Sequence, residues 1–373
     1  MSKAAELAAL IGGQKALGDK NLLINSDMQM AQHGTSKAMA HDGNTSVYVV
    51  DRFTMAFGGT HEQLDGTYAQ VADHPLSANG KSLKWTTGTA ESSYDADEYL
   101  YVAQKIEAQN LQSINNGNSN AVPITLSFYV KSSVTGTFAL GIYKEDSTTR
   151  IFNRTYAISS ANTWEKKTIT FAGDTSGGGI VNDNGAGFWI NWHLAAGSNA
   201  KGGGSNGAWK NYGGLSDWAD GQATNAIATT GGATWQLAQC QLEEGDVATQ
   251  FENEDLGTTL RKCHRYFQKV FAGADNRYLA GTSPNIFWNA TNTDNGGITF
   301  VETMRAAPSF SYNALKLRSP YAGDYTIGSL TANAITVNGL TTTTAGSSGS
   351  SNERVVYLAG TGTSSYYEID AEL

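Results

Sequence analysis

The sequence predicts a mostly β protein: a jelly-roll β-sandwich joined by a connector helix to a smaller C-terminal β domain. Three observations support this fold class. Only 16% of the 373 residues are charged, and 42 are glycine. Strand-forming Thr and aromatic residues, with turn-forming Gly, Asn and Ser, take the place of the Glu, Lys and Leu of exposed helix faces. Short stretches of alternating apolar and polar residues recur without long helices between them, which favours an antiparallel sandwich.

The clearest strand expected from the sequence is residues 124–131, ITLSFYVK, in which apolar and polar side chains alternate without interruption. Its apolar face would lie in a core. A turn at 135–136 and a second alternating stretch over 138–142 predict a hairpin with this strand. A further strand with one buried face is predicted from Phe188, Ile190, Trp192 and Leu194.

Composition and periodicity divide the chain into four segments. Residues 1–20 are expected to form a docking segment, 21–254 the jelly roll, 255–272 the connector helix and 273–373 the C-terminal β domain. Within the last segment, 341–352 is expected to be a flexible loop from its composition. The connector helix is predicted from Asp255, a good N-cap, and from apolar residues three or four apart: Leu256, Leu260, Cys263, Phe267, Val270 and Phe271.

The N-terminal segment carries a short helical pattern. Leu7, Leu10 and Ile11 have helical spacing before Gly12 and Gly13 end it. A helix of two turns is marginal alone in water. The segment is therefore either a frayed terminus or a short anchor helix that orders against another protein or another copy of the chain.

Charge and cysteine content narrow the function classes. A net charge of −9 provides no basic field for phosphates, so neither nucleic acid nor an anionic membrane is an expected partner. No run reaches the roughly 18 apolar residues needed to span a bilayer, and the N-terminus is a poor secretory signal. Assembly in a cytosol is expected. Cys240 and Cys263 are predicted to be two buried free thiols.

Three short motifs resemble catalytic signatures but lack the required context. Gly203–Gly207 matches G-x-S-x-G, yet it lies among loop glycines instead of between a strand and a helix. The Gly80-Lys81-Ser82 stretch lacks the earlier glycine of a phosphate loop, and His61-Glu62 lacks a second His at helical spacing for a zinc hydrolase. No acid–base pair follows from sequence spacing. The chain is predicted not to be an enzyme, and no cofactor is expected.

Loop carboxylates leave a calcium site open. Four aspartates lie in turn segments rich in Asn and Gly, where hard oxygen ligands could gather: Asp27, Asp174, Asp183 and Asp294. The alternative is that each carboxylate stabilises its own turn through Asx-turn hydrogen bonds.

The eight tryptophans are the most informative functional feature. Flat aromatic side chains stack on sugar rings, and neighbouring polar groups read the hydroxyls. Trp189, Asn191 and His193 share the strand face opposite the predicted core and would form a sugar platform if that face is open. Alternatively, the long loop 197–232 or a neighbouring subunit covers Trp189. Within that loop, the same choice between ligand contact and loop anchor applies to Trp209, Tyr212 and Trp218.

Several stretches together resemble a domain of tailed-bacteriophage fibre and tail-associated proteins. The first of them, 21–36 followed by 50–53, also resembles the start of a carbohydrate-binding-module jelly roll. These stretches are NLLINSDMQMAQHGTS at 21–36, VDRF at 50–53, LSFYVKSSVTGTF at 126–138, SANTWEKKTITFAGDTSG at 160–177, WQLAQCQLEEGDVATQFE at 235–252, LRKCHRYFQ at 260–268, MRAAP at 304–308 and DAEL at 370–373.

The resemblance implies a structural protein of the virion, a fibre or appendage whose jelly roll attaches to host-surface polysaccharide. Family members generally form symmetric oligomers, often trimers, and insert an N-terminal segment among other virion proteins, a role that Leu7, Leu10 and Ile11 fit. Related sugar-binding jelly rolls place an acidic pair before the last strand and coordinate a structural calcium. The equivalent stretch here is Leu237–Cys240, which puts calcium in doubt.

Two other functions remain open from the sequence. One is a purely architectural adaptor or capsid-decorating protein without a glycan ligand. The other is a polysaccharide depolymerase, which is disfavoured because such spikes usually stack a repeated β solenoid, and no period of 20–50 residues occurs in this chain.

Overall fold

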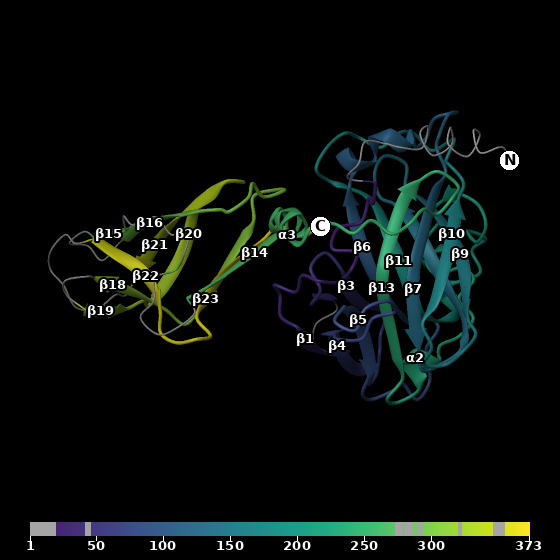
Figure 1. The fold of residues 1–373 in the computed structure, drawn as a ribbon, viewed down its shortest axis with the longest axis horizontal. Helices are drawn as coiled ribbons and strands as arrows, with labels where there is room; N and C mark the ends of the chain where they lie inside the picture. Colours follow the sequence, from purple (N-terminus) through teal and green to yellow (C-terminus); the bar gives the residue numbers. More distant parts are fainter. Residues whose placement is uncertain are drawn as a thin grey trace. The chain divides into compact units, whose positions relative to one another are not determined.

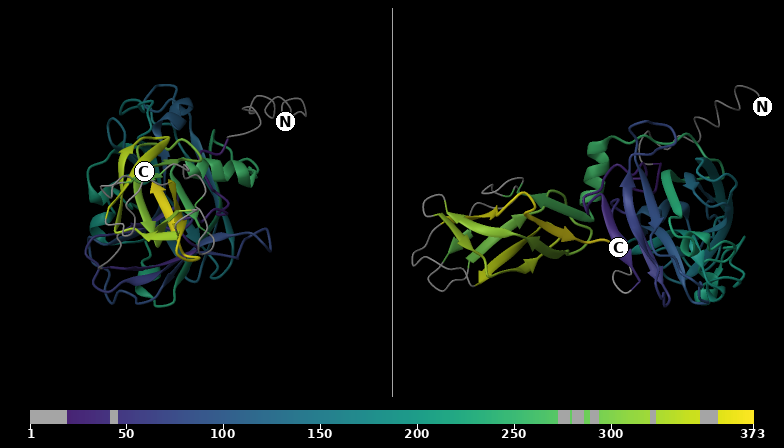
Figure 2. Two further views of the ribbon diagram at one scale, coloured as in Figure 1. Left: turned by 90° about the vertical axis from the view of Figure 1, so that its left-hand side faces the viewer. Right: turned by 90° about the horizontal axis from the view of Figure 1, so that it is seen from below.

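The computed structural model describes residues 20–41, 46–272, 279, 286–288, 294–319, 323–345 and 355–373. The chain divides into two compact units, Met1–Leu256 and Gly257–Leu373, and each has a hydrophobic core of its own. Strands dominate the described residues of both units, as the composition predicts (Figures 1 and 2). No helix within the described ranges is long and apolar enough to cross a membrane.

The first unit is a sandwich of two antiparallel sheets. The strand axes of the two sheets are roughly aligned in Figure 1. Short helical turns connect some of them: η1 (Ala108–Ile114), η2 (Ser198–Ala200), η3 (Leu215–Asp217) and α2 (Ala226–Thr229). The six-stranded sheet has the order β1 (Ser36–Ala40), β4 (Asp65–Val71), β5 (Ser82–Thr87), β13 (Thr234–Glu244), β7 (Ile124–Ser132) and β10 (Glu165–Phe171). The seven-stranded sheet has the order β12 (Lys210–Asn211), β9 (Arg150–Ile158), β8 (Gly136–Lys144), β11 (Ala186–Ala196), β6 (Tyr99–Glu107), β3 (Thr54–Gly58) and β2 (Ser46–Tyr48).

Successive strands repeatedly change sheets, as they do in a jelly roll. β6 and β8 belong to the seven-stranded sheet, whereas β7 between them belongs to the other. The predicted hairpin of 124–131 with 138–142 is therefore wrong, although both strands form. β7 pairs with β10 and β13, and β8 pairs with β9 and β11. Both strands bury one face in the same core, so their periodicity is the same for a hairpin and for a crossing between sheets.

The core of the first unit lies between the two sheets. Trp192 of β11 is fully buried there, with ring centroids 6.0 Å from Phe128 and 6.2 Å from Phe53. The other apolar residues of this β11 face are buried as well, which confirms the predicted core face. Cys240 in the first unit and Cys263 in the second are both buried free thiols, as predicted. Burial raises the pKa of the Cys240 thiol well above its ordinary value.

The second unit contains α3 (Leu256–His264) and two sheets. Leu317, Leu358 and Ile369 are among the residues of its core. The three-stranded sheet has the order β14 (Phe267–Phe271), β23 (Tyr366–Asp370) and β17 (Ser309–Asn313). The seven-stranded sheet has the order β19 (Gly323–Thr326), β18 (Leu315–Ser319), β22 (Val355–Gly360), β15 (Ile286–Trp288), β16 (Asp294–Thr299), β21 (Gly339–Ala345) and β20 (Ser329–Ile335).

Two predictions for the second unit need correction. The connector helix ends at His264 instead of 272, because 267–271 pair residue by residue with 366–370 as strand β14. Residues 341–345, expected to be part of a flexible loop, belong to β21, which pairs with β16 and β20. Threonine is β-branched and favours strands, so composition misled the loop prediction there. The rest of the predicted loop, 346–352, lies outside the described residues.

Candidate functional site

The outward face of the seven-stranded sheet carries Trp189, Asn191 and His193, all on β11. Strand register arranges them in rows across β6, β11 and β8, with Trp189 opposite both Lys105 and Tyr143. In the next outward row, Asn191 lies opposite Ala103 and Gly141. His193 follows in a third row, opposite Tyr101. Because alternate residues of a strand share one face, these side chains all project away from the core.

Trp218 covers this face from the long loop. Its ring centroid lies between 5.4 and 6.3 Å from the rings of His193 and five other aromatic residues. Trp218 itself is 8% exposed, whereas the five others are partly exposed. We call this set the aromatic cluster: Tyr99, Tyr101, Tyr143, Trp189, Tyr212 and Trp218.

Polar contacts hold Trp189 at the edge of the cluster. The Nε1–H of Trp189 donates a hydrogen bond to Oε2 of Glu145 at 2.6 Å. The ammonium of Lys105 lies 3.8 Å from the centroid of the Trp189 ring, within cation–π range. Tyr143 meets the same ring edge-on at 5.7 Å. Trp189 is therefore partly exposed but fixed in orientation, a geometry that reduces the entropy cost of binding a flat ligand.

The open platform predicted from Trp189, Asn191 and His193 does not form in this structure. Asn191 and His193 are 0% exposed beneath the cluster, whereas Trp189, which the alternative placed under a cover, is partly exposed. Both amide atoms of Asn191 and both ring nitrogens of His193 lack hydrogen-bond partners, as do Nε1 of Trp218 and Oδ1 of Asn153. Burial lowers the pKa of His193 to about 3. The imidazole is therefore neutral.

The long loop is pinned by Asp217, the residue before Trp218. The buried carboxylate of Asp217 accepts hydrogen bonds from Nζ of Lys210 at 2.8 Å and from the backbone N–H of Gly213 at 2.7 Å. The side-chain amide of Asn153, on β9, donates to the Asp217 carbonyl at 2.6 Å. These contacts tie the loop to the sheet and thereby set the position of Trp218.

The serine of the G-x-S-x-G match belongs to the same anchoring network. Ser205 is 0% exposed, and its hydroxyl donates to the carbonyl of Asp217 at 2.9 Å and accepts from Asn153 at 2.7 Å. The short strand β12 follows this stretch, where a nucleophile elbow requires a helix. Ser205 is therefore a loop anchor.

The two remaining loop aromatics have different positions. Tyr212 is part of the aromatic cluster, 5.0 Å from Tyr143, and burial raises its pKa to about 12. Trp209 instead packs on the edge of the sandwich core, where it stacks on Phe188 at 5.9 Å. Its Nε1–H donates to the carbonyl of Ala172 at 2.6 Å. Of the two roles considered for Trp209, the structure supports that of loop anchor.

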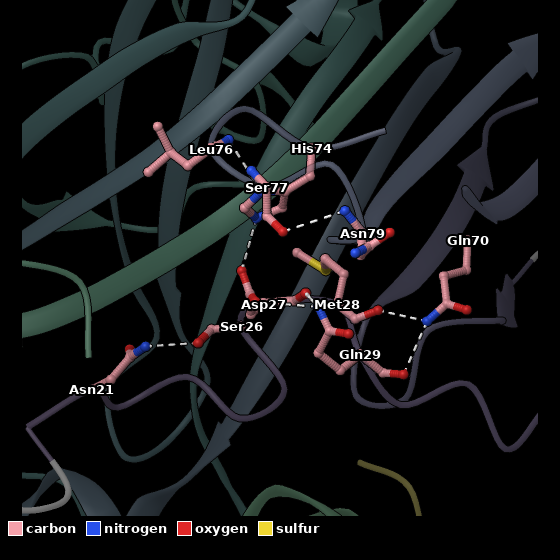
Figure 3. Close-up of polar contacts among 10 residues, drawn as sticks. All are labelled: Asn21, Ser26, Asp27, Met28, Gln29, Gln70, His74, Leu76, Ser77 and Asn79. Atoms are coloured by element: carbon pink, nitrogen blue, oxygen red, sulfur yellow. Dashed lines mark hydrogen bonds and ion pairs between the residues drawn. The ribbon is translucent and has the colours of Figure 1, made fainter. Parts of the chain in front are cut away.

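Asp27 does not fit a calcium site (Figure 3). Nδ1 of His74 accepts backbone N–H groups from Leu76 and Ser77, so Nε2 carries the proton and donates to Oδ1 of Asp27 at 3.0 Å. Oδ2 of Asp27 accepts from the side-chain amide of Gln29 at 3.1 Å. Both carboxylate oxygens thus have nitrogen donors, whereas Ca²⁺ needs six to eight oxygen ligands.

The other calcium candidates also lack the required arrangement where they are described. Asp174 is buried, and its two oxygens accept from Nε and Nη2 of Arg150 at 2.5 and 2.9 Å. Asp183 accepts the backbone N–H of Gly185 at 2.8 Å, which is the Asx-turn alternative. The side chain of Asp294 lies outside the described residues, as do the proposed anchor residues Leu7, Leu10 and Ile11.

Sequence reasoning missed several members of the cluster. Tyr99 and Tyr101 alternate with buried Leu100 and Val102 along β6, so their outward direction was readable once that strand was recognised. Tyr143 follows the recognised stretch 138–142 and has the opposite direction to Ile142. What the sequence did not contain was the pairing that brings these strands beside Trp189.

No protein-family model and no curated protein sequence matches this chain. Similar solved structures include carbohydrate-binding modules and a phage tailspike domain. The enzymatically active domain of tailspike protein 4 from bacteriophage CBA120 is 11% identical, with a TM-score of 0.30, over 60% of this chain and 21% of its own. The family 11 carbohydrate-binding module from Clostridium thermocellum, in complex with a β-1,3-1,4-mixed-linked tetrasaccharide, is 12% identical over 58% of this chain and 98% of its own, with a TM-score of 0.28. The CBM22-1 xylan-binding domain from Paenibacillus barcinonensis has the same identity and TM-score over 62% and 99%. At these values the similarity supports no inference about function.

Proposed function

We propose that the first unit binds a glycan on the outward face of its seven-stranded sheet, through the aromatic cluster. The observation that carries this proposal is the set of partly exposed rings of Tyr143, Trp189 and Tyr212 around a central Trp218. Such rings offer flat apolar surfaces to the C–H faces of sugars. Glu145 and Lys105 lie beside them and can hydrogen-bond to hydroxyls.

The roles of the sequence-predicted residues change accordingly. Trp189, Tyr212 and Trp218 remain glycan-contact residues in this proposal. Asn191 and His193 support the cluster from beneath, because both side chains are fully buried. Trp209 stabilises the loop through the core edge.

We also propose, from the sequence resemblance, that the chain is a non-enzymatic structural protein of a tailed-phage virion. In this role it would be a fibre or appendage that attaches to host-surface polysaccharide. It would act as a homo-oligomer, with Leu7, Leu10 and Ile11 inserted among other virion proteins. A trimer multiplies weak sites, since linked binding raises avidity by orders of magnitude without new contacts.

The test compares two tryptophans in similar settings. Trp164 is also partly exposed, has Nε1 3.2 Å from a carboxylate oxygen of Asp73, and has the ammonium of Lys131 5.2 Å from its ring. It lies beside the six-stranded sheet, just before β10, and so serves as the matched control. Trp189→Ala should weaken binding about tenfold, or ~1.4 kcal/mol, and Trp164→Ala should leave binding unchanged.

Binding is measured with the full chain on an array of bacterial surface polysaccharides, followed by affinity electrophoresis on any glycan retained. Equal losses for the two variants would move the site away from the aromatic cluster. Absence of saturable binding to every glycan would favour the architectural adaptor. New reducing ends after incubation with host polysaccharide would instead identify a depolymerase.

A further inference from the structure

Two loops at one end of the first unit bring together three buried titratable side chains. His61 lies between β3 and β4, and Glu91 and Glu98 lie between β5 and β6. The side chain of His61 is 2% exposed, and those of Glu91 and Glu98 are 0% exposed. Within the described part of the chain, this is the group of His, Cys, Asp and Glu side chains whose ligand atoms lie close enough to share a metal ion.

Backbone groups occupy one oxygen of each carboxylate and leave the other unpaired. Oε1 of Glu91 accepts from three backbone N–H groups, those of Glu62, Gln63 and Leu64, at 3.0 to 3.3 Å. Oε2 of Glu98 accepts from the backbone N–H of Asp95 at 2.8 Å. The buried Oε2 of Glu91 and Oε1 of Glu98 have no hydrogen-bond partner.

The imidazole of His61 faces these two carboxylates. Neither of its ring nitrogens has a hydrogen-bond partner of ordinary geometry, although both are buried. Nδ1 lies 3.5 Å from Oε1 of Glu91 and 3.5 Å from Oε1 of Glu98. Ligand atoms at about 2.0–2.1 Å from a tetrahedral Zn²⁺ are roughly 3.3–3.4 Å apart, and the separation of Nδ1 from the unpaired Oε1 of Glu98 is close to this value. One ligand atom from each of the three side chains lies within 4.8 Å of the others.

Charge balance also favours a divalent cation. Two buried carboxylates without a cation are costly. A neutral imidazole donates a ring-nitrogen lone pair to a metal ion. Two carboxylates and one neutral imidazole balance the charge of a divalent cation.

The surroundings hold the three side chains in place. The ring of His61 lies between Phe57 and Tyr94, at centroid distances of 5.3 and 5.6 Å. Gly59 has φ of 84°, and a Cβ there would lie 2.3 Å from the carbonyl oxygen of Asp97. The loop of His61 therefore packs backbone to backbone against the loop of Glu98.

We propose that His61, Glu91 and Glu98 form a structural Zn²⁺ site that clamps these two loops together, with a water as the fourth ligand. An imidazole ligand favours zinc over calcium or magnesium, which prefer oxygen ligands alone. The sequence around His61 contains no second His one helical turn away, so the short motif His61-Glu62 did not predict a metal site. The partners here are carboxylates from another loop, and the site is independent of glycan binding.

The test titrates the metal-free full chain with ZnCl₂ by calorimetry, using Glu62→Gln as the matched control. Glu62 lies in the same loop as His61, but its side chain is exposed. The wild type and Glu62→Gln should bind one Zn²⁺ per chain. Glu98→Gln and His61→Gln should each lose at least tenfold in affinity. In the wild type, Tm should rise by roughly 5–10 °C at a Zn²⁺ concentration about 100 times Kd.

Co²⁺ bound to the wild type provides a readout that needs no variant, because a tetrahedral site gives intense visible absorption and an octahedral site does not. Zn²⁺ should displace that signal. Failure of the wild type to bind Zn²⁺, equal binding by Glu98→Gln and Glu62→Gln, or stabilisation by Ca²⁺ in place of Zn²⁺ would each overturn the proposal.

Discussion

Replacing Trp192 by Ala tests the assignment of the two faces of β11. The side chain is 0% exposed and reaches Phe128 on the opposite sheet and Phe53 next to β3. Removal of a buried Trp costs about 3–5 kcal/mol through lost contacts and the cavity left behind. Nε1 of Trp192 has no hydrogen-bond partner, and deleting an unpaired buried donor returns about 1 kcal/mol. We therefore expect a loss of about 3 kcal/mol, at the lower end of the range.

The assay is guanidinium unfolding of the full chain, followed by near-UV circular dichroism, with thermal unfolding as a second measure. A loss of about 3 kcal/mol should lower the Tm of the first unit by roughly 6–12 °C. Trp192→Phe keeps most of the ring volume and removes the unpaired N–H, so its cost should stay below about 1.5 kcal/mol. Trp189→Ala, on the outward face, should cost about 1 kcal/mol. A larger cost for Trp189→Ala than for Trp192→Ala would show that the faces are reversed.

Three further predictions follow from the same structure. His193 is buried and neutral with its pKa lowered to about 3, so below its unfolded pKa of about 6.5 the unfolded state binds more protons. The contribution of this residue should therefore lower the free energy of unfolding by about 2 kcal/mol when the pH falls from 7 to 5. Unfolding curves of His193→Gln, measured at both pH values, should lack this contribution. Asp174→Ala removes the carboxylate partner of the buried Arg150, which keeps only its hydrogen bond to Asn211, and should cost about 3–5 kcal/mol; added Ca²⁺ should not raise the Tm of the wild type. Deletion of residues 1–17 should leave both units folded by circular dichroism but abolish incorporation into virions, and normal incorporation would contradict the anchor role.

Local periodicity predicted which side chains are buried better than it predicted which strands pair. The alternating pattern of 124–131 and the core face with Trp192 are both present in the structure. The partner of each strand is determined by the whole sheet, so the hairpin prediction failed where the chain crosses between sheets. The connector helix failed at 267–271 for a related reason, because the strand that pairs with this stretch lies about a hundred residues later.

The candidate sites show the same limit. The outward direction of Trp189 followed from alternation along one strand, and its position on β11 is as expected. Whether that face was open depended on Trp218, whose place is set by contacts of Asp217 with Lys210 and Asn153. No periodic pattern encodes such a loop. His61 and its two carboxylates likewise come from loops that only the folded sheets bring together.

The position of β13 has a consequence for synthesis of the protein. This strand is the last of the first unit in the chain, yet it lies in the middle of the six-stranded sheet, between β5 and β7. It also receives the start of the unit, because the backbone N–H of Leu22 donates to the carbonyl of Leu242 at 2.8 Å. During translation, the edges of β5 and β7 that pair with β13 therefore stay unpaired until residue 244 has left the ribosome. Non-local pairing of this kind slows folding and exposes strand edges to aggregation, so the rate of translation through 234–244 should influence the yield of native protein.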